Sequence, residues 1–128
     1  MAYYISKTIS ADFDETITHV TEALKEEGFG VLTDIDIKAT LKKKLDVDFR
    51  RYRILGACNP QFAYSALQHE AHVGTMLPCN VIVQEHEPGE IEVSAVDPIA
   101  SMQAIQNPDL QEIAHEVRAR LERVVNNL

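Results

Sequence analysis

The 128-residue sequence lacks most of what a secreted or membrane-spanning protein needs. It has two cysteines, and no uninterrupted apolar run approaches the roughly 18 residues of a transmembrane helix. Its first residues, MAYYISKTISADFDE, show no basic segment followed by an apolar one. These absences argue against a membrane span, a secretory signal and a disulfide framework. We therefore expect a cytoplasmic protein whose cysteines are free thiols.

Basic side chains are also scarce, because 12 Lys and Arg residues face 20 Asp and Glu residues, giving a net charge of −8. A nucleic-acid partner needs a basic surface, and an anionic membrane attracts basic segments. The charge therefore argues against both partners. The sequence also lacks internal repeats and low-complexity segments. Its length fits one domain, residues 1–128, with a core of its own.

Alternating and helical patterns of apolar residues predict five strands with helices between them. Strands are expected over residues 3–9, 29–36, 49–58, 79–86 and 91–96, and helices after residues 12, 36, 59, 97 and 107. Pro88 and Gly89 predict a type II turn that joins the last two strands in a hairpin. This order predicts an α+β fold in two layers, an antiparallel-rich five-stranded sheet with helices packed on one face.

The sheet face that the helices leave uncovered is expected to carry an apolar patch bordered by polar and charged groups. Its predicted members are Tyr4, Leu32, Leu55, Ile82 and Val96 among Asp34, Arg51, Arg53, Gln84 and Glu92. An apolar patch of this kind is typical of a dimer interface or a ligand-binding face. We therefore expect a homodimer formed through part of this face.

The segment from Gly56 to Val83 contains both cysteines. Cys58 ends a predicted strand just before a helix, where the helix dipole favours a thiolate. Cys79 begins the next predicted strand. The thiols would be neighbours if these two strands are antiparallel, and they would lie at opposite ends of the sheet if the strands are parallel. Three interpretations stay open: buried structural thiols, a thiol-based enzyme or redox sensor, and a metal-binding module.

An asparagine follows each cysteine, so that CNP and PCN mirror one another around the intervening helix. Each amide could satisfy backbone groups at the start of its own helix or strand. Alternatively, both could line a polar pocket beside the thiols. The sequence predicts, as its leading site hypothesis, a small-molecule site at one edge of the sheet, formed by Cys58, Asn59, Cys79 and Asn80.

His69 and His72 are spaced to share one face near the end of a predicted helix, where they could bind a transition metal with Glu70 or a cysteine. Their order, HEAH, differs from the HExxH of zinc proteases, and two histidines near a helix C-terminus also gain from its dipole without a metal. No P-loop, nucleophile elbow, GxGxxG or paired-carboxylate motif is present. The sequence therefore names no cofactor and no catalytic residue, and it leaves open whether the protein is an enzyme.

Several segments together resemble one known family. GACNP at residues 56–60, LPCNVIV at 77–83 and EEGFGVLTDIDIKATLKKKL at 26–45, with a hairpin and an Asp97-Pro98 step after them, are similar to the bacterial and archaeal domain of unknown function 302 family. The positions that carry the resemblance are Gly56, Cys58, Asn59, Pro60, Gly74, Pro78, Cys79 and Asn80. It implies a two-layer α+β fold near the TATA-binding-protein-like folds, and dimer formation. It implies no DNA binding and assigns no activity.

Overall fold

The computed structural model describes residues 2–128. Its elements, in chain order, are β1 (Tyr4–Ser10), α1 (Phe13–Glu26), β2 (Gly30–Asp36), α2 (Ile37–Leu45), β3 (Tyr52–Cys58), α3 (Pro60–His69), a 3₁₀ helix η1 (Ala71–Met76), β4 (Cys79–Glu87), β5 (Glu90–Val96), α4 (Pro98–Ser101) and α5 (Pro108–Asn126). The predicted elements are all found. The sequence patterns missed η1, because six residues without a clear apolar period read as a loop.

The five strands form one open sheet in the order β1-β5-β4-β3-β2, and every neighbouring pair is antiparallel. β4 and β5 form the predicted hairpin, with Gly89 at a positive φ of 80° in its turn. β1 and β2 are the two edges. Because β3 and β4 are antiparallel, the end of β3 and the start of β4 lie at the same edge of the sheet.

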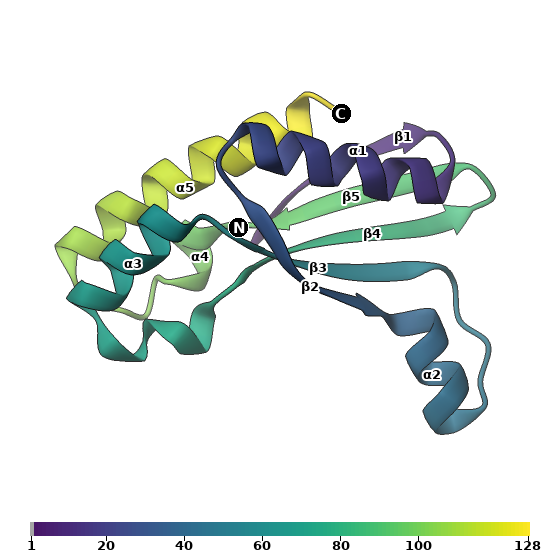
Figure 1. Ribbon diagram of the computed structural model, residues 1–128, viewed down its shortest axis with the longest axis horizontal. Coiled ribbons are helices and arrows are strands. Elements are labelled where there is room, and N and C mark those ends of the chain that lie inside the picture. The colour runs from purple at the N-terminus through teal and green to yellow at the C-terminus, as the bar shows by residue number, and fades with distance from the viewer. Residues whose placement is uncertain (1) are drawn as a thin grey trace.

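Helices α1 and α5 pack side by side on one face of the sheet, and α3 continues this layer alongside α5 (Figure 1). Between the layers lies a core of aliphatic side chains, in which Val20, Leu24, Val81, Val93 and Leu121 have no exposed surface. By contrast, α2 projects beyond the ends of β2 and β3 and buries none of its side chains fully (Figure 1). The two-layer α+β prediction is confirmed.

Local sequence signals account well for the end of α1. The Phe29 N–H donates to the Leu24 carbonyl at 2.9 Å and the Gly28 N–H donates to the Lys25 carbonyl at 3.0 Å. This is the Schellman pattern, and Gly28 has the positive φ of 89° that the pattern requires. The turn directs the chain back under α1, so that Phe29 and Leu24 are buried in the same core.

The composition predicted for the uncovered sheet face needs correction. Leu55 is 1% exposed and lies in the core, opposite Val81 in the register. Residues paired across neighbouring strands point to the same face, so Asp34 and Arg53, whose register partners are Leu55 and Val83, also lie on the helix side. Arg51 is on that side too, since its guanidinium lies over the Phe13 ring of α1 at 5.8 Å. The uncovered face is therefore less charged than expected.

A bulge in β2 explains another difference from the sequence pattern. The register between β2 and β3 shifts between Val31 and Thr33, so that Leu32 has no partner. Simple alternation would place Val31, Thr33 and Ile35 on one face, but the extra residue reverses the phase after Leu32. Val31 packs against the core, whereas Ile35 is 46% exposed. Within residues 2–128, no helix has both the length and the apolar character of a bilayer span.

Candidate functional site

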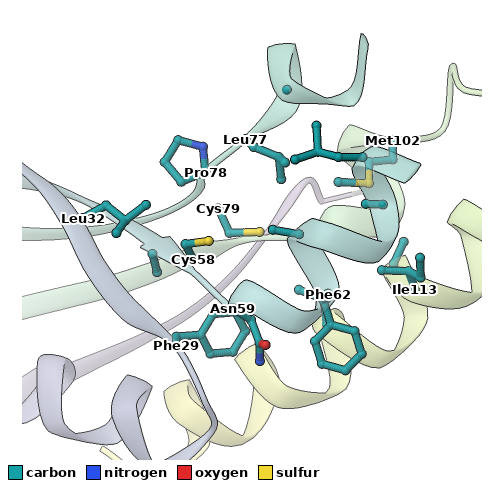
Figure 2. A pocket seen from close by; sticks show the side chains of 17 residues that line it. Phe29, Leu32, Cys58, Asn59, Phe62, Leu77, Pro78, Cys79, Met102 and Ile113 are labelled. Carbon is teal, nitrogen blue, oxygen red and sulfur yellow. The ribbon is translucent and has the colours of Figure 1, made fainter. Parts of the chain in front are cut away.

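A cavity of about 340 Å³ lies where the ends of β3 and β4 meet α3, η1 and α5. Figure 2 shows the side chains that surround it, among them Phe29, Phe62, Leu77, Met102 and Ile113. Of the described side chains that line this cavity, none is charged. The wall consists of aliphatic and aromatic groups, three sulfur atoms and one amide. A cavity of this composition favours an uncharged, largely apolar molecule.

Both cysteines line this cavity, and both are free thiols. Cys79 is the register partner of Ala57, so Cys58 lies one residue beyond the position opposite Cys79. Regular alternation would direct the two side chains to opposite faces, but Cys58 is the last residue of β3, at the point where the chain leaves the sheet for α3. The two sulfur atoms lie side by side on the cavity wall (Figure 2). The antiparallel alternative of the sequence analysis is therefore the correct one.

The Cys79 thiol is 7% exposed. Burial, and to a smaller degree the neighbouring Cys58, raises the pKa of Cys79 to about 11. Desolvation disfavours the thiolate because an apolar wall cannot replace its hydration. Cys79 is therefore protonated near neutral pH and is a poor nucleophile there. The redox interpretation of the thiol pair stays a prediction, and it would have to begin at Cys58, which is more accessible.

Asn59 stands between β3 and α3 and is 9% exposed. The sequence predicts that its amide caps α3, but its side chain makes no capping hydrogen bond there. Instead, Asn59 Nδ2 donates to the Glu27 carbonyl at 3.3 Å, and Arg120 Nη1 donates to the same oxygen at 3.0 Å. The amide thus ties the end of α1 to the start of α3. Asn59 borders the cavity, and one of its two N–H groups is used for this structural contact.

Asn80 does not join the other three predicted site residues. Its register partner is Gly56, and it is exposed in a hollow on the uncovered sheet face. Alternation along β4 requires this, because Cys79 points to the helix side. Cys58, Asn59 and Cys79 therefore lie around one cavity, while Asn80 lies on the opposite side of the sheet.

His69 and His72 do not share a site, because each contacts different partners. His69 Nδ1 is 2.7 Å from the Ser65 carbonyl, and its Nε2 is 3.7 Å from Asp109 Oδ2. The His72 side chain is 92% exposed and its Nδ1 is 3.4 Å from Glu70 Oε1. Among the residues that the structure describes, no three His, Cys, Asp or Glu side chains form a group that could hold a metal ion. The histidine-based metal site therefore has no geometric support.

The sequence analysis missed most of the wall. Met102 and Ile113 are 23 and 34 positions after Cys79, and neither carries a functional signal, because both fit apolar stripes that predict ordinary core packing. Leu32 and Leu67 are 68% and 46% exposed and border the cavity from β2 and α3. Large apolar side chains exposed at a cavity are unusual enough to mark its opening. Only the tertiary structure brings these groups together.

Pro78, which lines the cavity, packs against Gly56 of β3. An added Cβ at Gly56 would overlap Thr33 Oγ1 and would lie 2.8 Å from Pro78 Cγ. The Pro78 ring thus occupies the space that a side chain at position 56 would need, and Pro78 and Cys58 both line the cavity (Figure 2). This contact gives a physical reason for a glycine in the middle of β3.

Comparisons with known proteins agree with this architecture. The model of the family described as "Domain of unknown function DUF302" matches residues 5–128. The crystal structure of an uncharacterized conserved DUF302 protein from Bacillus stearothermophilus has a TM-score of 0.90 and 32% sequence identity, covering 98% of each chain. No curated protein matches. With nearly the whole chain matched by the family model, the protein belongs to the DUF302 family, whose activity is unknown.

Proposed function

We propose that this protein binds a small, uncharged and largely apolar molecule in the cavity between α3, η1, α5 and the ends of β3 and β4. The observation that carries the proposal is the cavity itself, about 340 Å³ in volume and lined by side chains none of which is charged in the described part of the chain. Ligand cavities in proteins typically measure roughly 300–1,000 Å³ and are mainly apolar. An empty space of this size among apolar side chains is costly for packing, and a bound molecule would recover the lost contacts.

The wall also limits the chemistry of the ligand. A carboxylate or ammonium inside the cavity would lose its hydration without gaining a countercharge. The Asn59 amide carries no charge that could compensate, and one of its two N–H groups already donates to the Glu27 carbonyl. Any charged group of the ligand would therefore have to remain at the opening beside Leu32 and Leu67, in contact with water.

A neutral fluorescent probe tests the proposal. N-phenyl-1-naphthylamine should bind the wild-type protein with one site per chain and gain fluorescence on leaving water. The variant Ala63→Phe places an aromatic ring in the cavity from α3, where Ala63 lines it. We expect this variant to weaken probe binding at least about tenfold, equivalent to about 1.4 kcal/mol.

The matched control is Ala39→Phe, which adds the same ring at an exposed position of α2 outside the cavity. It should bind the probe as the wild type does. Equal binding by the wild type and Ala63→Phe, with both folded by circular dichroism, would show that the cavity is not the binding site.

We also propose that the protein forms a homodimer through its uncovered sheet face. A hollow of about 460 Å³ on this face is lined by apolar and polar side chains. Tyr3 and Tyr4 are 71% and 45% exposed at one border of the face, and Ile35 is 46% exposed at the other. An uncovered sheet face with exposed aromatic and aliphatic side chains supports contact with a second copy.

A further inference from the structure

Apart from the amide of Asn59, the side chains that can donate an electron pair into the cavity all carry sulfur. They are the thiols of Cys58 and Cys79 and the thioether of Met102. The other polar side chain on the wall, Asn59, is held by the carbonyl oxygen of Glu27. Sulfur is a soft donor, and soft donors select soft cations such as Cu(I) over Mg²⁺ or Ca²⁺.

The two thiols are close enough to act together. The antiparallel register puts Cys79 opposite Ala57, the residue before Cys58, and charge on Cys58 affects the ionisation of Cys79. Cys58 is the last residue of β3 and Cys79 is the first residue of β4. The rest of the sheet and the helices packed on it fix the position of both strand ends. The sulfur of Met102 lies farther along the cavity wall, next to η1 and α3 (Figure 2). The paired donors are therefore Cys58 and Cys79.

We propose that Cys58 Sγ and Cys79 Sγ form a two-coordinate site for one soft monovalent cation, Cu(I) or its analogue Ag(I). In this reaction both S–H bonds break, two S–metal bonds form, and two protons leave to solvent, with no change in oxidation state. The positive ion offsets one of the two thiolate charges, so the complex carries a single negative charge instead of the two that the apolar wall would disfavour more strongly.

The same donor set argues against zinc. A structural zinc ion needs four protein ligands in a tetrahedral arrangement, and a catalytic one needs three. Only two thiols are present, and His69 and His72 do not line the cavity. A cation that accepts two sulfur ligands in a nearly linear arrangement is satisfied without further donors. The apolar wall around it excludes water, which would otherwise complete the shell of a harder ion.

Competitive titration tests the site. Reduced protein is titrated with Cu(I) under anaerobic conditions against the colorimetric chelator bicinchoninate. We expect one Cu(I) per chain for the wild type. Cys58→Ala and Cys79→Ala should each weaken apparent affinity by more than the roughly 10- to 100-fold typical of losing an outer contact. Met102→Leu, which conserves volume and changes only the third sulfur, should bind like the wild type.

A second measurement on the wild type needs no variant. Ag(I) at one equivalent should protect both thiols from iodoacetamide under native conditions, and mass spectrometry counts the alkylated cysteines. The proposal is wrong if the Cys58→Ala/Cys79→Ala double variant, folded by circular dichroism, binds Cu(I) as tightly as the wild type, or if the wild-type protein does not compete with the chelator.

Metal binding and binding of an apolar molecule can fail separately. The alanine variants leave the wall apolar, so N-phenyl-1-naphthylamine should still bind them. Conversely, loss of probe binding in wild-type protein with copper binding intact would refute the ligand proposal and leave the dithiol site standing.

Discussion

Gly56 has no side chain, and the space beside it is occupied. Thr33 Oγ1 can rotate away from an added Cβ, but the ring of Pro78 is rigid and begins only 2.8 Å from that position. Pro78 stands directly before Cys79 and lines the cavity. A change of one methyl group at Gly56 should therefore be transmitted to the cavity wall rather than absorbed locally.

We predict that Gly56→Ala lowers the free energy of unfolding by about 1–3 kcal/mol, the usual cost of adding a methyl group where no space exists. The probe affinity should fall as well, because Pro78 must move. Urea denaturation and probe titration measure the two effects. Gly30→Ala is the control on the neighbouring strand, where an added Cβ meets nothing within 4 Å; a cost as large as that of Gly56→Ala would contradict the steric explanation.

The elements of the helix layer meet at one carbonyl group. The oxygen of Glu27, just after α1, accepts hydrogen bonds from Asn59 at the start of α3 and from Arg120 in α5. A second contact strengthens this junction, since Arg123 Nη2 lies 2.9 Å from Glu27 Oε1. These contacts fix the relative positions of α1, α3 and α5, which are distant in sequence, beside the cavity.

The two asparagines of the CNP and PCN segments should respond differently to the same change. Asn59→Asp replaces the donor with a carboxylate facing the Glu27 carbonyl oxygen, so we expect a loss of about 1–3 kcal/mol in stability, the cost of a buried polar group left without its partner. Asn80→Asp, exposed on the other sheet face, should change stability by less than about 0.5 kcal/mol. Chemical denaturation of both variants compares them; equal losses would refute the structural role assigned to Asn59.

At this scale the sequence was a good guide wherever the signal is local. The Schellman turn at Gly28 and the hairpin turn at Gly89 depend on residues within a few positions, and the hairpin turn was predicted correctly. The bulge at Leu32 and the direction of the Asn59 amide depend on distant partners, Gly56 of β3 and Glu27 just after α1. Sequence alone could place the cysteines at strand ends, but only the antiparallel register brings them together.

The whole molecule presents one sheet face to its helices and the other to its surroundings. Ile82 lies near the centre of the uncovered face, paired with Ile54 on one side and Ser94 on the other. In a dimer formed through this face, such a central position would lose contact with water on association. In a monomer, the same position would tolerate a polar side chain.

We predict that Ile82→Lys converts a dimer into a folded monomer, because two buried ammonium groups would face one another without countercharges. Sedimentation velocity at micromolar concentration measures the state of assembly. Thr18→Lys, which adds the same charge at an exposed position of α1, should remain dimeric. A wild-type protein that sediments as a monomer at this concentration would refute the interface.

The position of β2 at the edge of the sheet has a consequence for how molecules enter and leave. β2 pairs with β3 alone, and its bulged residue, Leu32, borders the cavity. An edge strand can detach from its neighbour at a fraction of the free energy of global unfolding, and amide hydrogen exchange detects such local openings. Fraying of this strand is therefore expected to widen the opening beside Leu32, so that the rates of binding and release depend more on β2 than on the stability of the entire domain.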